Sequence, residues 1–230
     1  MPSCAGWAEP VRLEQHWRTE DGIDLPMALW RPGPGYRMIS SGILGGGLGP
    51  RDWVLNAQVA GGYSRMDPVE HLGELAASLR LTGPGIGLLT AAQITGLVQR
   101  DDEGVHAAAT TGLRVPTWAA APAGSADAEL APIRIGTINI IVEVPVPLGD
   151  AAFVNAVVTA TEAKTQAVLD AGFRCTGTAS DAICIASPEA GTQEQFAGPR
   201  SQWGARIARA VHAAVYAGAC EYAARLNRPF

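Results

Sequence analysis

The feature that most restricts the fold is a long helical segment enclosed by two apolar segments. Residues 133–146 are rich in Ile and Val, which is typical of buried strands. Residues 150–171 then repeat apolar side chains at helical spacing, and a glycine follows where helices commonly end. The short apolar segment 181–187 predicts a second strand. We therefore expect a strand–helix–strand arrangement in the C-terminal half.

A similar order of elements occurs earlier in the chain. Residues 53–60 alternate as a half-buried strand does, and an Asp-Pro pair at 67–68 is typical of a helix start. This helix is expected to run to about residue 81, before an apolar strand at 86–90, and a terminal helix is expected over 201–226. The elements predict an α+β fold with a mixed β-sheet flanked by helices. A layered α/β arrangement stays open, because one sequence does not give the strand order.

The two halves share further details. Asn56 and Asn139 each lie within an apolar strand, and Thr-Gly pairs follow the two helices at 82–83 and 176–177. If the halves are pseudo-repeats related by a two-fold axis, both asparagines and both Thr-Gly turns lie near one central cleft. The sequence identity between the halves is too low to establish a duplication.

The length of 230 residues is that of one generous domain or of two small packed halves. Residues 1–35 end in a loop rich in Pro and Gly, and we expect them to form an N-terminal extension. Residues 36–230 are then expected to form a single domain. Hydrophobic residues make up 47% of the chain, so a sizeable core can form.

Composition excludes several classes of protein. A net charge of −5 argues against a surface that binds nucleic acid or an anionic membrane. Four scattered cysteines do not predict a disulfide framework or a zinc site, and the four histidines lack metal-ligand spacing. No signal peptide and no apolar segment of 18 residues is found, so we expect a soluble cytoplasmic protein without a bound metal.

Lys164 is the most informative polar residue, because it falls within the apolar arc of the helix at 150–171 together with Thr161. One interpretation is that its amine extends past the core to solvent. The other is that it anchors a ligand or pairs with a carboxylate in a cleft, since an unpaired buried charge is costly. Asp181 and Glu162 are the nearest candidate partners.

Hydroxyl groups and a carboxylate gather in the turn at residues 175–181, between a helix end and a buried strand. Such turns supply hydroxyls and backbone N–H groups to ligands, but they also stabilise their own backbone, and spacing alone does not separate the two roles. Similar polar side chains end or interrupt other apolar strands. They are Thr90, Thr111, Thr137 and Asn139.

Several segments, read together, resemble the adenosylcobinamide amidohydrolase family. They are residues 40–47 (SSGILGGG), 87–92 (GLLTAA), 136–142 (GTINIIV), 160–165 (ATEAKT), 175–181 (CTGTASD) and 198–204 (GPRSQWG). The resemblance covers roughly residues 36–218, and Leu89 departs from it where Met is expected. Residues 1–35 have no clear counterpart, so the resemblance makes 36–230 the amidohydrolase domain.

The resemblance implies an enzyme of corrinoid salvage. Such enzymes hydrolyse the amide that joins aminopropanol to the corrin ring, which gives adenosylcobyric acid and 1-amino-2-propanol. The corrinoid is then the substrate, and neither a cofactor nor a nucleic-acid or membrane partner is expected. The oligomeric state stays open. A non-catalytic corrinoid-binding or carrier protein is the alternative function.

Amide hydrolysis needs a nucleophile, a proton donor for the leaving amine and donors for an oxyanion. We expect Asp181 or Glu162 to activate water with help from Lys164. A threonine nucleophile, Thr178 or Thr111, is the competing mechanism. The remaining candidates are an oxyanion donor, Asn139, and the substrate-binding residues Ser41, Asn56, Thr90, Thr111, Thr137, Thr161 and Ser180.

Overall fold

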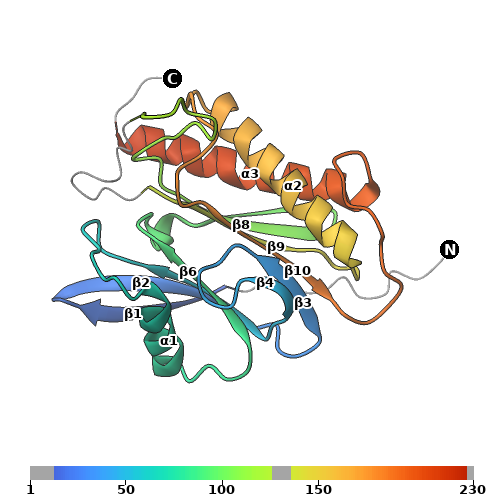
Figure 1. Ribbon diagram of the computed structural model, residues 1–230, viewed down its shortest axis with the longest axis horizontal. Helices are drawn as coiled ribbons and strands as arrows, with labels where there is room; N and C mark the ends of the chain where they lie inside the picture. The colour runs from blue at the N-terminus through green and yellow to red at the C-terminus, as the bar shows by residue number, and fades with distance from the viewer. Residues whose placement is uncertain (1–12, 126–135, 227–230) are drawn as a thin grey trace.

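Two β-sheets pack face to face at the centre of the molecule, and helices cover both outer faces (Figure 1). The computed structural model describes residues 13–125 and 136–226. Apolar side chains of both sheets, such as Val54 of one and Ile141 of the other, form the core between them. The order of layers is therefore helix, sheet, sheet, helices.

The first sheet has four strands in the order β1 (Glu14–Glu20), β2 (Ile23–Trp30), β5 (Trp53–Gln58) and β6 (Gly85–Thr90). β5 and β6 are parallel, and the other neighbours are antiparallel. Helix α1 (Pro68–Ser78) connects β5 to β6 and packs on the outer face of this sheet through Leu72 and Leu75.

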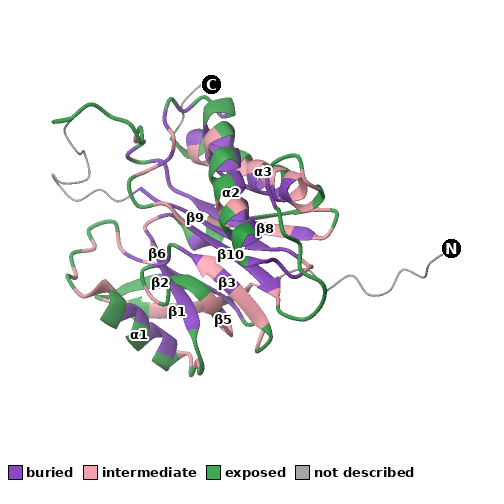
Figure 2. Ribbon diagram, turned by 45° about the vertical axis from the view of Figure 1, so that its right-hand side comes forward, coloured by how far each residue is buried: buried purple, intermediate pink, exposed green. Residues whose placement is uncertain are grey.

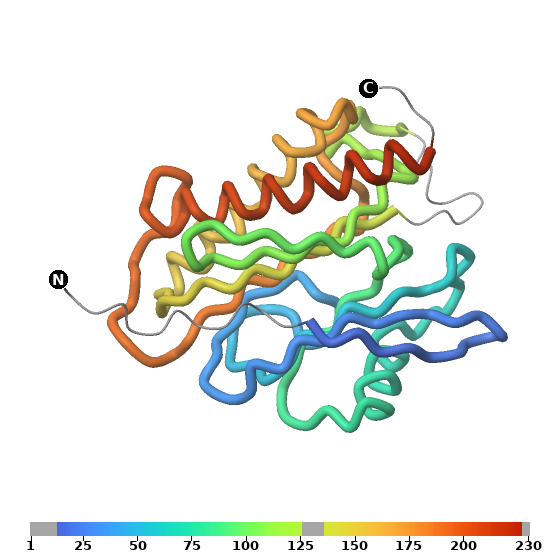
Figure 3. The backbone as a smooth tube through the Cα atoms, turned by 180° about the vertical axis from the view of Figure 1, so that it is seen from behind, coloured from blue at the N-terminus to red at the C-terminus, as the bar shows by residue number. Residues whose placement is uncertain are grey.

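The second sheet has six strands in the order β4 (Gly47–Pro50), β3 (Tyr36–Ser40), β10 (Ala182–Pro188), β9 (Ile138–Glu143), β8 (Val105–Thr111) and β7 (Val98–Asp102). β9 and β10 are parallel, and α2 (Asp150–Asp170) connects them. α3 (Gln202–Arg225) packs beside α2 on the outer face (Figure 3). A short 3₁₀ helix, η1 (Ile94–Gly96), precedes β7. Both sheets are mixed, so the α+β prediction is confirmed.

Each sheet contains one parallel β–α–β unit, β5–α1–β6 and β9–α2–β10. The Nδ2 atom of Asn139 donates to the Oδ1 atom of Asn56 at 2.9 Å, so the two asparagines meet between the sheets as expected. The expectation for the Thr-Gly turns is wrong. Asn139, near the start of β9, donates to the Leu89 carbonyl at the end of β6, and the neighbouring Ile138 N–H donates to Asp181 of the 176–181 turn. The 82–83 turn instead precedes the start of β6.

Residues 14–30, which lie within the expected N-terminal extension, form β1 and β2. β2 pairs with β5 over four residues from Met27 to Trp30. No strand is expected here from the sequence pattern. β5 is buried on both faces, not half-buried, because α1 covers its outer side and the second sheet covers its inner side (Figure 2).

The buried face of α2 differs from the expected arc. Val154 and Val158, which helical spacing places in the apolar arc, are exposed. Thr159, which the same spacing places on the solvent side, is buried and donates to the carbonyl oxygen of Ala197 at 2.9 Å. The buried stripe consists largely of small side chains, which let α3 and β10 approach closely. These alanines are Ala152, Ala156, Ala160, Ala163 and Ala167. Because alanine is only weakly hydrophobic, the valines dominate the helical periodicity, and this periodicity predicts the wrong buried face.

Candidate active site

The carboxylate of Asp181 is the centre of a polar cluster at the start of β10. Its Oδ2 atom accepts from the Lys164 ammonium at 2.5 Å and from the Thr178 N–H at 3.1 Å. Its Oδ1 atom accepts from the Thr178 hydroxyl at 2.6 Å and from the Ile138 N–H at 2.9 Å. Both side chains of the ion pair are only 9% exposed. Four donors therefore fix this carboxylate, and the lysine does not extend to solvent.

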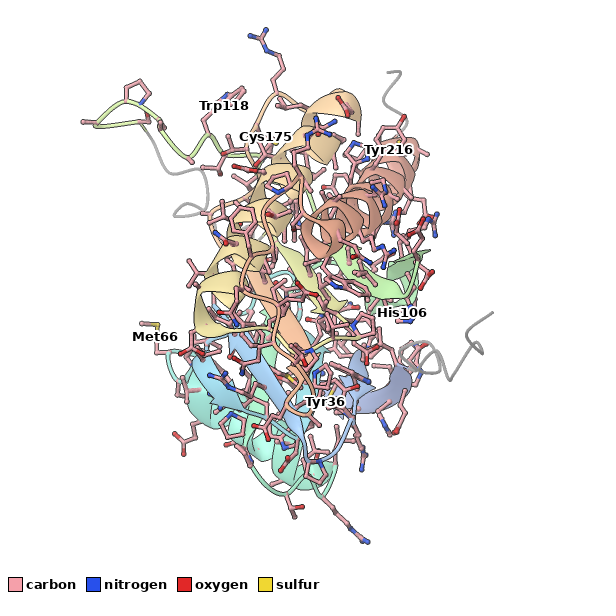
Figure 4. The ribbon with its side chains drawn as sticks, turned by 90° about the vertical axis from the view of Figure 1, so that its right-hand side faces the viewer. Tyr36, Met66, His106, Trp118, Cys175 and Tyr216 are labelled. Carbon is pink, nitrogen blue, oxygen red and sulfur yellow. The ribbon has the colours of Figure 1, made fainter. Side chains whose placement is uncertain are left out.

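The backbone of the 176–181 turn is shaped to hold this ion pair. Gly177 has a φ of +147°, and a Cβ atom there would lie 2.1 Å from Asp181 Oδ2 and 2.5 Å from Lys164 Nζ. A side chain at this position would thus displace the pair. The Thr117 N–H donates to the Gly177 carbonyl at 2.8 Å, so the segment that follows β8 runs along the turn. Figure 4 shows Trp118 of this segment and Cys175 at the same end of the molecule.

Two further hydroxyls adjoin the cluster. Ser180 Oγ donates to the carbonyl oxygen of Gly136 at 3.0 Å, and Thr137 Oγ1 lies 2.9 Å from Ser180 Oγ. Each hydroxyl has one proton, so Thr137 donates to Ser180. Thr137 is buried, whereas Ser180 is exposed and Thr178 is partly exposed. The reachable groups of the cluster are therefore the hydroxyls of Thr178 and Ser180.

Asn56 and Asn139 lie deeper, between the sheets, each 1% exposed. Asn139 Nδ2 donates to Asn56 Oδ1 and, at 2.8 Å, to the Leu89 carbonyl, and Asn56 Nδ2 donates to Thr110 Oγ1 at 3.2 Å. Within the described residues, Asn139 Oδ1 has no hydrogen-bond partner. Because the Asn139 amide protons are engaged, this arrangement does not present them to an oxyanion.

Thr161 and Glu162 are not part of the cluster. Both are exposed, and Thr161 Oγ1 donates to the carbonyl of Val157, one turn earlier in α2, at 2.8 Å. Glu162 is two residues from Lys164, about 200° around a helix, so the two side chains lie on different faces. Glu162 instead lines a groove of about 400 Å³ between α2 and α3.

The remaining predicted residues serve neighbouring segments. Ser41 Oγ accepts from the Ile183 N–H at 3.1 Å, beside the cluster, and Thr90 Oγ1 accepts from the Ala92 N–H at 3.0 Å. Thr111 Oγ1 is buried and has no partner within the described part of the chain. A Cβ atom at Gly218 of α3 would lie 2.6 Å from this oxygen, so the helix passes close to it.

Comparisons with known proteins give the family. The family model for adenosylcobinamide amidohydrolase matches residues 12–227. The chain belongs to this family. A curated relative, the adenosylcobinamide amidohydrolase of Methanosarcina mazei, is 29% identical over 192 residues, which are 80% of this chain and 90% of the relative. The family match begins at residue 12, so it includes β1 and β2, for which the sequence motifs had shown no counterpart.

Within this family member, Lys164 is the only lysine of the chain. The presence of a single lysine is therefore a sequence signal that supports Lys164 as a site residue. The backbone N–H of Ile138 is a contact that sequence reasoning missed, because it depends on the pairing of β9 with β10. Cys175 is buried beside the ion pair, and burial raises the pKa of its thiol, which disfavours a thiolate nucleophile.

Among the described residues, no group of three or more His, Cys, Asp or Glu side chains is placed to hold a metal ion. Over the same residues, none of the helices combines the length and apolar character needed to cross a bilayer.

Proposed function

We propose that this chain hydrolyses the amide that joins aminopropanol to the corrin ring of adenosylcobinamide. The products would be adenosylcobyric acid and 1-amino-2-propanol, and the reaction would serve the salvage of incomplete corrinoids. The family match supports the reaction. The observation that carries the assignment of the site is the Lys164–Asp181 ion pair beneath the partly exposed hydroxyl of Thr178.

Of the two mechanisms open from the sequence, the geometry favours the threonine nucleophile. A carboxylate that already accepts four hydrogen bonds has little capacity left to bind and activate water. The Thr178 hydroxyl, in contrast, donates to Asp181 at 2.6 Å, which is the contact that a general base makes with a nucleophile.

The proposed reaction has two steps. Thr178 Oγ1 attacks the amide carbon while its proton moves to Asp181, and the C–N bond then breaks as the leaving amine takes up that proton. This leaves an ester between Thr178 and the corrin propionate. Water hydrolyses the ester, which regenerates the hydroxyl and releases the acid. Lys164 holds the Asp181 carboxylate in place and balances its charge.

The test is incubation with adenosylcobinamide followed by mass analysis of both the corrinoid and the protein. The wild-type chain should remove aminopropanol, and Thr178→Val should lower turnover by about 10³-fold or more. Thr161→Val is the matched control, since the Thr161 hydroxyl is bonded to its own helix, and it should keep normal turnover.

The possible outcomes separate the hypotheses. An acyl adduct that maps to Thr178 supports the nucleophile. Full activity of Thr178→Val would exclude the threonine mechanism and favour activated water. Tight binding of adenosylcobinamide with unchanged mass would overturn the enzyme and favour a corrinoid carrier.

A further inference from the structure

A second concave site lies beside the candidate active site. It is a cavity of about 250 Å³ where the loops after β5, β6 and β8 meet the C-terminal end of α3. Figure 3 shows these loops and this helix end on one side of the molecule. The lining residues are Gly61, Ala91, Ala92, Gln93, Thr111, Gly112, Arg114, Tyr222, Arg225 and Leu226. None of them takes part in the Asp181 cluster.

Among the described residues, those that line this cavity carry only positive charge. Arg114 and Arg225 are the charged ones, and none of these lining residues is an acid. The Arg225 Nη1 atom donates to a neutral acceptor, Gln93 Oε1, at 2.7 Å. Arg114 forms no ion pair with any residue in the described ranges. In a chain with a net charge of −5, two guanidinium groups thus face one cavity, and no carboxylate of residues 13–125 or 136–226 pairs with them.

Several other arginines form ion pairs with acidic side chains. Arg65 pairs with Asp67 at 2.6 Å, and Arg209 pairs with Asp102 at 2.6 Å. Those guanidinium groups serve the fold. The two cavity arginines retain donors for a ligand, and planar guanidinium groups bind phosphate oxygens through paired hydrogen bonds.

Two hydrogen bonds connect the cavity to the candidate active site. The Gly112 N–H donates to the Thr137 carbonyl at 2.9 Å, and the Thr137 hydroxyl lies 2.9 Å from that of Ser180. A ligand in the cavity is therefore a near neighbour of a substrate whose amide lies at Thr178. The amides at the edge of a corrin are neutral and would leave both arginines unpaired, whereas a phosphoryl group would neutralise them.

We propose that this cavity binds a phosphoryl group. This inference deepens the proposed function. It rests on that function where the phosphoryl group is carried by the substrate, as a phosphate ester on the aminopropanol hydroxyl. Free inorganic phosphate is the other source of the same chemistry. In both cases Arg114 and Arg225 supply the charge-assisted hydrogen bonds.

The first experiment is calorimetric titration of the full chain with inorganic phosphate at low ionic strength. Phosphate should bind, and Arg114→Gln and Arg225→Gln should each weaken binding by about tenfold or more, as expected for a lost hydrogen bond to a charged group. Arg200→Gln is the matched control. Arg200 is exposed just before α3, at the opposite end of that helix, so its loss should not change phosphate binding.

The second experiment compares hydrolysis of adenosylcobinamide with hydrolysis of its phosphate ester. If the substrate carries the group, kcat/KM for the ester should fall about tenfold in both cavity variants, while kcat/KM for adenosylcobinamide stays constant. If free phosphate is the ligand, added phosphate should change both rates equally in wild type and not in the variants.

The outcomes also separate this proposal from the proposed function. Phosphate binding that depends on Arg114 and Arg225 in a chain that hydrolyses no corrinoid would overturn the function and keep the site. Absence of phosphate binding, together with equal effects of both variants on the two corrinoids, would overturn the phosphoryl site whether or not the chain is an amidohydrolase.

Discussion

The two β–α–β units each bury one basic side chain of their helix, but they accommodate it differently. His71 of α1 is 2% exposed, with the Tyr63 hydroxyl 3.0 Å from Nδ1 and Glu20 3.4 Å from Nε2. Lys164 of α2 is also buried and forms an ion pair with Asp181. Burial lowers the pKa of His71, so the imidazole is accommodated as the neutral ring. The second unit instead provides the Asp181 carboxylate, which pairs with the Lys164 ammonium.

The Thr-Gly turns of the two units also differ in how freely the neighbouring aspartate side chain can move. A Cβ atom at Gly83 would lie 2.0 Å from Asp52 Oδ2, just as one at Gly177 would lie 2.1 Å from Asp181 Oδ2. Both glycines thus leave room for an acidic side chain. Asp52 is partly exposed and can move, whereas four donors hold Asp181. Of the two turns, the second therefore holds its carboxylate in a fixed ion pair.

The largest effect is expected from Lys164→Met, which keeps the length of the side chain but removes its charge. Asp181 then stays buried without a cation, so the free energy of unfolding should fall by about 3–5 kcal/mol. Turnover of adenosylcobinamide should fall by at least about 10²-fold. Urea unfolding and mass-detected turnover measure the two effects. His71→Gln is the matched change in the other unit and should leave turnover unchanged.

A double variant separates stability from chemistry in this pair. Lys164→Met combined with Asp181→Asn removes both charges, so much of the lost free energy of unfolding should return while turnover stays low. If the double variant regained activity as well, the ion pair would serve only the fold.

Because Lys164 is the only lysine, ¹⁵N-lysine labelling gives one side-chain signal, and substrate should shift it.

The next largest effect is expected from an alanine at each turn glycine. Gly177→Ala must displace Asp181 or Lys164, so turnover per folded molecule should fall by at least about tenfold. Gly83→Ala should cost about 1–2 kcal/mol, because φ is +75° there, but Asp52 can swing aside and turnover should persist. Equal losses of turnover in both variants would contradict the difference drawn between the units.

Local patterns were enough to predict much of the second unit. The helix expected over 150–171 is α2, and Lys164 was singled out from its place among apolar positions, with burial of its amine left open. The choice between Asp181 and Glu162 could not be made in this way, since both are close to Lys164 in sequence. It depended on the helix face of Glu162 and on the closure of the 176–181 turn, which is a tertiary contact.

The first unit and its sheet were harder to predict. β1 alternates exposed and half-buried side chains, and many of them are charged, so its sequence resembles a solvated segment. Its place is set by pairing with β2, where Trp17 lies opposite Pro26, and such pairing is not encoded within either strand alone. The cavity arginines were missed for the same reason, because Arg114 and Arg225 are 111 residues apart in sequence and meet only in the fold.

A smaller effect is expected where the two units touch. Asn139→Leu removes the donors to Asn56 and Leu89, and it leaves Asn56 Oδ1 buried without that partner. The free energy of unfolding should fall by about 1–3 kcal/mol. A double-mutant cycle with Asn56→Leu should give a coupling of about 0.5 kcal/mol or more, measured by urea unfolding. Additive losses would show that the two sheets do not depend on this contact.

The smallest effect concerns His71 and the pH dependence of stability. Its folded-state pKa lies below the unfolded value of about 6.5, so the two states bind protons equally above pH 7.5. As the pH falls through 6.5, the unfolded chain takes up a proton that the folded chain resists. The free energy of unfolding therefore decreases until the folded pKa is passed, and this loss is below 1.4 kcal/mol per pH unit.

The charged groups near His71 modify this slope without reversing it. Glu20 and Glu74 raise the pKa of His71, whereas Arg18 and Arg65 lower it, but burial is the largest cause. Urea unfolding of the wild type and of His71→Gln between pH 5 and pH 8 measures the contribution, with His16→Gln as the control on the more exposed β1. The slope should flatten only in His71→Gln. An unchanged slope would mean that folding does not lower the pKa of His71, and the contrast with Lys164 would then be lost.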